Sequence, residues 1–208
     1  MVKYWRREKY LFDTNSLIYA SETWDEGYKR AVHWAKTKNR SPLLYLARRR
    51  YGESIVRHII DRCALGYAEC VTPEIVVEEI RKTREEDLRN RTLDLIALAN
   101  IRIESMNITP QEIISQMPYK FRREIESYIE EAKKRGRKVG VDMSADPYLL
   151  YLAYKQGYTL VTTDRKLADL ATRLGIEVIY PVTKEIRIEE AKYRPRTRIK
   201  PIYARPYT

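Results

Sequence analysis

Cysteine is scarce in this sequence, which contains two among its 208 residues, Cys63 and Cys70. Two cysteines supply neither the disulfide framework of a small secreted domain nor the repeated pairs of a zinc knuckle, so both classes of protein are excluded. We expect buried free thiols at these positions. The alternative is a disulfide between them, a bond that intracellular proteins of hyperthermophiles do contain.

Long apolar segments are also missing. No stretch of about 18 consecutive apolar residues occurs, and a transmembrane helix needs at least that length. The N-terminal sequence MVKYWRREKY is basic, but neither an apolar segment of signal-peptide length nor a small-residue cleavage site follows it. We therefore expect an intracellular, cytoplasmic protein with no membrane partner.

Acidic residues are the minority charge. Lys and Arg number 40 against 29 Asp and Glu, which gives a formal net charge of +11. A basic excess is typical of proteins that bind a polyanion, and nucleic acid is the first expectation. The mixed charged surface of a thermophile protein accounts for 33% charged residues, but it does not account for the excess of one sign.

Short apolar segments alternate with helix signals along most of the chain. The segments with strand character cover residues 9–12, 69–72, 101–105, 158–162 and 176–180. Apolar residues crowd together in the first of them, as is typical of a strand buried on both faces. Serine or threonine followed by proline, as at Ser41, Thr72 and Thr109, marks helix starts. Alternating strands and helices predict a three-layer α/β/α sandwich around a parallel sheet of four or five strands.

Two long helical segments interrupt this alternation, at about residues 39–66 and 82–137. We interpret them as insertions in one domain that spans residues 1–189, with a possible helix break near Gly52. Residues 190–208 differ in composition and form a basic tail rich in Pro and Tyr. Its RNA-binding candidates are Arg194, Arg196, Arg198, Lys200 and Arg205. The alternative for this tail is a disordered, solubilising end.

Four acidic residues stand where expected strands end or expected helices begin. Asp13 and Asp164 follow the first and fourth strands, Glu79 lies on the helix after Pro73, and Asp146 stands at a helix start. In an open parallel sheet, ligands bind beyond the carboxyl ends of the strands. Clustered carboxylates repel one another unless a cation neutralises them, and Mg²⁺ and Mn²⁺ prefer oxygen ligands. Such an ion can activate water and stabilise a leaving oxygen, so the pattern predicts a phosphodiesterase site.

The segments around these acids resemble the four motifs of PIN-domain nucleases, the family that includes the VapC-like ribonucleases. The matching segments are LFDTN at 11–15, PEIVVEEI at 73–80, DPYLLYLA at 146–153 and LVTTD at 160–164. The resemblance implies a sheet order of 3-2-1-4-5 and one or two Mg²⁺ or Mn²⁺ ions held by the four acids. It also implies that Asn15 and Thr162 orient the first and last acid.

A fifth acid, Asp142, precedes Asp146 by four residues and is a further metal-ligand candidate. The spacing of Asp142, Asp146 and Asp164 also resembles the PIN-like, protein-only RNase P of the HARP type, which implies maturation of tRNA 5′ ends as an alternative. Purely structural roles remain open for single acids. Asp13 can accept backbone bonds in a turn, and Asp146 before Pro147 can cap its helix.

The resemblance therefore implies a metal-dependent endoribonuclease that hydrolyses phosphodiester bonds of tRNA, rRNA or mRNA. The partners it implies are RNA, the ribosome, an antitoxin if the protein is a toxin, and a second copy of the chain, each by analogy with the family. The alternative from another class is a non-catalytic RNA- or ribosome-associated protein that keeps the PIN scaffold.

Overall fold

A computed structural model describes residues 8–38, 42–105, 107–134 and 145–181 of the chain. The predicted tail at 190–208, with its five basic candidates, and Asp142 lie outside these residues, so their predicted roles stay predictions. Within the described ranges, no helix is both long and apolar enough to cross a membrane.

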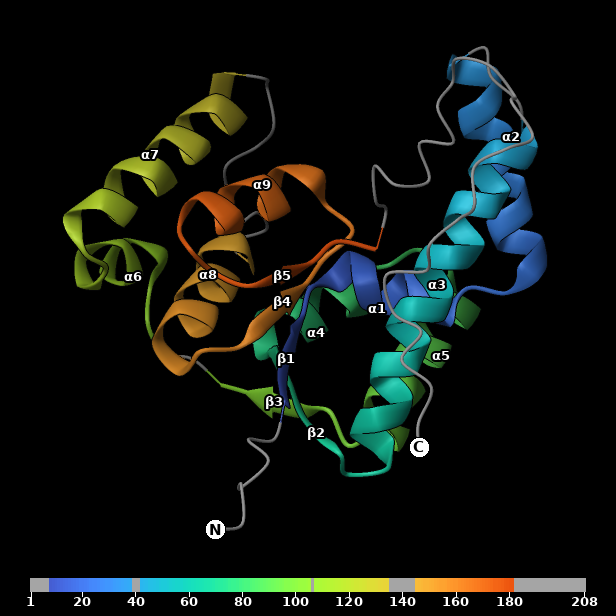
Figure 1. Cartoon of the computed structure of the whole chain (residues 1–208), viewed down its shortest axis with the longest axis horizontal. Helices are drawn as coiled ribbons and strands as arrows, with labels where there is room; N and C mark the ends of the chain where they lie inside the picture. The colour runs from blue at the N-terminus through green and yellow to red at the C-terminus, as the bar shows by residue number, and fades with distance from the viewer. Residues whose placement is uncertain (1–7, 39–41, 106, 135–144, 182–208) are drawn as a thin grey trace, which may run out of the picture.

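The centre of the molecule is one sheet of five parallel strands (Figure 1). They are β1 (Glu8–Phe12), β2 (Ala68–Pro73), β3 (Arg102–Glu104), β4 (Thr159–Val161) and β5 (Val178–Ile179). Their spatial order is β3-β2-β1-β4-β5, which confirms the order implied by the resemblance. The chain moves outward from β1 to β3 and then returns to the other side of β1, so the winding direction reverses between β1 and β4.

Helices cover both faces of this sheet, which confirms the three-layer α/β/α class (Figure 1). The helices are α1 (Thr14–Ser21), α2 (Trp24–Lys38), α3 (Pro42–Ala64), α4 (Glu74–Arg81), α5 (Glu86–Leu98), α6 (Pro110–Gln116), α7 (Tyr119–Lys134), α8 (Ala145–Gln156) and α9 (Arg165–Arg173). On one face α1 packs against α3, α4 and α5, and on the other α8 packs against β1 and β4. The hairpin of α2 and α3 extends beyond the sheet, and α6 and α7 lie on the far side of the molecule, next to α8 (Figure 1).

The middle strands are buried on both sides, as the crowding of their apolar residues predicts. Leu11 pairs in register with Val71 of β2 and with Leu160 of β4, and all three side chains are fully buried. Burial of each such side chain stabilises the fold by roughly 1.5–3 kcal/mol. The ends of β1 and β4 are therefore held rigidly, and the residues that follow them are well positioned.

Three local features differ from the prediction. Residues 14–21 form α1, which the sequence patterns did not indicate. Helix α8 begins at Ala145, so Asp146 lies in its first turn and the predicted N-cap position is wrong. Pro147 fits inside that turn because the first amides of a helix have no intrahelical partner. Helix α3 continues through Gly52 without the predicted break, and a Cβ there would meet the Pro181 carbonyl oxygen at 2.6 Å.

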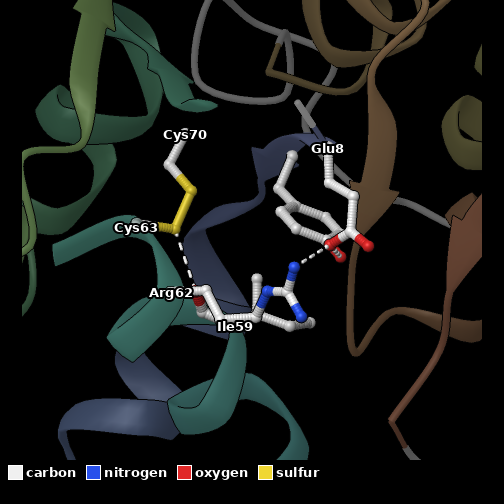
Figure 2. The surroundings of a disulfide bond; sticks show 6 residues. Glu8, Ile59, Arg62, Cys63 and Cys70 are labelled. Atoms are coloured by element: carbon white, nitrogen blue, oxygen red, sulfur yellow. Dashed lines mark hydrogen bonds and ion pairs between the residues drawn. A yellow bond between two sulfur atoms is a disulfide. The ribbon is translucent and has the colours of Figure 1, made fainter. Parts of the chain in front are cut away.

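The expectation of free thiols is also wrong, because Cys63 and Cys70 form a disulfide (Figure 2). Cys63 lies in the last turn of α3 and Cys70 in β2. The tight turn between them passes through Gly66, whose φ of 75° is the left-handed conformation that glycine adopts readily. This turn brings the two Cα atoms to 5.7 Å, a separation that a disulfide can span. Nearby, Arg62 pairs with Glu8 of β1 at 3.0 Å (Figure 2).

Candidate functional site

Asp13 is the most buried of the predicted acids that the structure describes, with 3% of its surface exposed. It follows β1 directly and caps the N-terminus of α1, where its Oδ1 accepts a 2.6 Å hydrogen bond from the Ser16 amide. The Thr162 hydroxyl donates to its other oxygen, Oδ2. Burial raises the pKa of Asp13 to about 6, and the charge of Asp164 adds to the rise, while the bonds from Ser16 and Thr162 oppose it. Part of the population is therefore protonated near neutral pH.

Asp164 lies beside Asp13 because β1 and β4 end together. The register places Phe12 opposite Val161, and both chains then turn into helices. Asp164 caps α9, and its Oδ1 accepts bonds from the amides of Lys166 at 2.7 Å and Leu167 at 3.2 Å. The structure thus brings together the first and last predicted acids at the point where the winding of the sheet reverses, which is where parallel sheets bind ligands.

One buried hydroxyl connects these two acids. The Thr162 side chain is fully buried and donates to Asp13. The same oxygen accepts a 3.0 Å bond from the Asp164 amide. Because the hydroxyl has one proton, and it is directed to Asp13, the bridge has a fixed direction and holds both residues in place. Thr162 was predicted to orient the last acid, and in the structure its hydroxyl instead contacts the carboxylate of the first acid, Asp13, and the backbone amide of Asp164.

Glu79 of α4 is connected to the residue that follows Asp13, and not to either aspartate of the pair. The Thr14 hydroxyl, one residue after Asp13, donates to Glu79 Oε2. A second contact fixes the end of β2, since the Thr72 hydroxyl donates to the Phe12 carbonyl at 3.1 Å. Glu79 is partly buried, whereas its neighbour Glu78 is exposed. Of these two neighbours, the predicted candidate Glu79 is therefore the one that α4 turns toward α1.

The remaining candidates are placed less directly. Asp146 is partly buried in the first turn of α8, the helix that packs on β1 and β4. Asn15 is exposed in the first turn of α1, and it is the Ser16 amide that binds Asp13. Sequence reasoning missed Thr14 and Ser16. Ser16 could have been predicted, because the side chain of an N-cap aspartate accepts a hydrogen bond from the backbone amide two or three residues later.

Within the described ranges, no three Asp, Glu, His or Cys side chains gather as a metal-binding group. The four-carboxylate centre that was predicted is therefore not assembled in this part of the chain. The pair formed by Asp13 and Asp164 still fits a hard cation. Mg²⁺ is commonly held by one or two carboxylates, with water and substrate phosphate oxygens as its other ligands. A buried carboxyl with a raised pKa beside a second carboxylate is also the electrostatic situation that a cation relieves.

The chain was compared with known proteins on sequence. No protein-family model matches it, and no curated protein matches it either. The resemblance to PIN-domain nucleases therefore depends on the motif residues and on the geometry described above.

Proposed function

We propose that this protein is an endoribonuclease of the PIN type that uses Mg²⁺ or Mn²⁺ to hydrolyse RNA phosphodiester bonds. The observation that carries the proposal is the pairing of Asp13 with Asp164 through Thr162 at the switch point of the sheet. A fold needs no buried carboxyl with a raised pKa at that place, and such perturbed groups cluster at functional sites.

Each residue of the candidate site has its own role in this proposal. Asp13 and Asp164 would hold the cation, and Thr162 fixes the distance and the orientation between them. Glu79, held by Thr14, adds negative charge on the α4 side of the same site. The cation supplies stabilisation of the phosphate charge and a lowered pKa for a bound water. The basic excess of the chain attracts the RNA and holds it against the acidic site.

The test is cleavage of end-labelled RNAs by the purified full chain with Mg²⁺, Mn²⁺ or EDTA. We expect Asp13→Asn and Asp164→Asn each to lower the cleavage rate by about 10²-fold or more, the usual size for loss of one group that stabilises transition-state charge. Asparagine also caps helices well, so both variants should keep their circular dichroism spectra. Asp169→Asn, an exposed change on the same α9 helix, is the matched control and should cleave normally. Full cleavage activity in both Asp13→Asn and Asp164→Asn would refute the assignment of this pair as the active site.

The RNA panel should include a precursor tRNA, a ribosomal RNA fragment and an unstructured messenger fragment. A cut confined to the 5′ leader junction of the precursor tRNA would favour maturation of tRNA 5′ ends, as by RNase P, over the activity of a toxin-type nuclease. The sites of cleavage are read on a sequencing gel.

The second candidate is an RNA-binding protein that keeps this scaffold without cleaving. It is favoured by the observation that no three carboxylates gather in the described part of the chain. Calorimetric titration with Mn²⁺ separates the two candidates. RNA binding without metal uptake and without cleavage would support the second, and metal uptake lost in Asp164→Asn would support the first.

A further inference from the structure

A hollow lies at the opposite end of α1 from the candidate site. It has a volume of about 440 Å³ and is lined by residues at the end of α1, the start of α2 and the middle of α3. These residues are Glu22, Thr23, Trp24, Glu53, Ser54 and Arg57. The predicted site and its motifs use none of them, so the hollow has no role so far.

Two exposed aromatic rings lie in the first turns of α2; Trp24 lines the hollow, and Tyr28 packs beside Trp24. Trp24 is 49% exposed and Tyr28, four residues later, is 47% exposed. Their ring centroids are 6.5 Å apart and the planes are inclined by 30°. A tilted pair of half-exposed rings offers flat surfaces on which a further ring can stack.

The charges around the hollow favour a neutral ligand over a cation. Glu53 pairs with Arg57 at 2.7 Å, and Glu22, which is buried, pairs with Arg49. Each lining carboxylate therefore already has a guanidinium partner, and an incoming basic side chain would meet Arg57. The lining still includes the Thr23 hydroxyl, carboxylate acceptors and guanidinium donors. A flat ring that carries both donors and acceptors suits this mixture, and a nucleobase is such a ring.

Helix α1 connects the hollow rigidly to Asp13. Arg57 donates to the carbonyls of Ala20 at 3.1 Å and Glu22 at 3.3 Å, and Arg91 donates to the Ser21 carbonyl at 3.2 Å. These bonds satisfy the last carbonyls of α1, whose first turn is capped by Asp13. A helix of eight residues is about 12 Å long. That distance equals roughly three or four stacked nucleotides at about 3.4 Å per step.

We propose that this hollow, with the Trp24 and Tyr28 rings, binds an unpaired nucleobase of the RNA a few nucleotides from the bond that is cut. The proposal rests on the proposed function for its ligand class, and it assigns to that nuclease a place where substrate is selected. Exposed Lys29, next to Tyr28 on α2, would lie near the phosphate of the bound nucleotide.

The test measures binding of a fluorescently labelled single-stranded RNA of about twelve nucleotides by anisotropy. The RNA carries 2′-O-methyl groups and the buffer contains EDTA, so no cleavage and no metal enter the result. We expect Trp24→Ala to raise Kd by roughly 5- to 100-fold, the size of losing one stacked base. Trp24→Phe keeps a stacking face and should change Kd by less than about threefold. Ser54→Leu, which fills the hollow from α3, should weaken binding as Trp24→Ala does.

Tyr119→Ala is the matched control, because Tyr119 is an aromatic residue 76% exposed on α7, far along the chain from α2. It should leave Kd unchanged, and thermal melting checks that all variants fold. Equal Kd for Trp24→Ala and the unchanged chain, or no RNA binding by the unchanged chain, would overturn the proposal. So would a Trp24-dependent affinity for an arginine-rich peptide in place of RNA. Trp24-dependent RNA binding by a chain that never cleaves would refute the nuclease and leave this base site standing.

Discussion

Asp13 should destabilise the metal-free protein at neutral pH, and its replacement by asparagine should therefore stabilise it. Burial raises the pKa of Asp13 from 3.8 to about 6. Between these two values the unfolded chain releases the proton while the folded protein keeps it. The free energy of unfolding then falls as pH rises through this window, by about 3 kcal/mol for this one group, and stays lower above it.

Asparagine fits the same place without this penalty. Its carbonyl oxygen can accept from the Ser16 amide, as Asp13 Oδ1 does at 2.6 Å. Its amide can donate to the Thr162 oxygen, as the proton of protonated Asp13 would, and in both cases the Thr162 hydroxyl proton loses its carboxylate acceptor. We therefore expect Asp13→Asn to match the unchanged protein near pH 4 and to exceed it by up to about 3 kcal/mol at pH 7.5.

Urea unfolding followed by circular dichroism, at steps from pH 4 to pH 8 in EDTA, measures this difference. Asp169→Asn removes a carboxylate with 67% of its side chain exposed, and its curve should follow that of the unchanged protein. Excess Mg²⁺ or Mn²⁺ should raise the stability of the unchanged protein at pH 7.5 and leave Asp13→Asn nearly unaffected, because a ligand of the folded state stabilises it by mass action. If Asp13→Asn is the less stable protein at pH 7.5, or if the difference does not vary with pH, the reasoning about burial fails.

Two further predictions concern stability away from the site. Gly52→Ala should lower stability by about 1–2 kcal/mol in thermal melts, because overpacking against the Pro181 carbonyl outweighs the roughly 1 kcal/mol gain in helix propensity. Ser54→Ala on the same helix is its control, and a more stable Gly52→Ala protein would contradict the close contact. Replacing Cys63 and Cys70 with alanine should cost about 2–3 kcal/mol in urea unfolding, from the closure entropy of a loop with a sequence separation of 7. Unchanged stability, or two free thiols in the oxidised protein by thiol titration, would refute this.

Local signals predicted most of the fold. The capping box formed by Thr109 and Glu112 and the crowded apolar residues of β1 are readable from neighbours in sequence, and both are present. Helix α1 was missed because its residues, TNSLIYAS, include Thr, Asn, Ser and Tyr, which favour helix weakly. It forms because Asp13 caps it and because Leu17 is fully buried. The disulfide was missed because it depends on the turn at Gly66, which the cysteine spacing alone does not specify.

The site was predictable to the extent that topology brings strand ends together. Asp13 and Asp164 meet because β1 and β4 are neighbours, which the strand order already implied. The contact of Thr14 with Glu79 depends on how α4 packs against α1, and no sequence pattern reports that packing. The position of Asp146 inside α8 depends on where that helix begins. These are tertiary features, and local propensity carries little information about them.

The strand order has a consequence for synthesis of the protein. Asp13 is made early, but its partners Thr162 and Asp164 follow β4, which inserts beside β1 only after most of the chain has left the ribosome. A nascent chain therefore has the first carboxylate but lacks the pair, whatever chemistry that pair performs. The proposed site is therefore incomplete until β4 has joined the sheet beside β1.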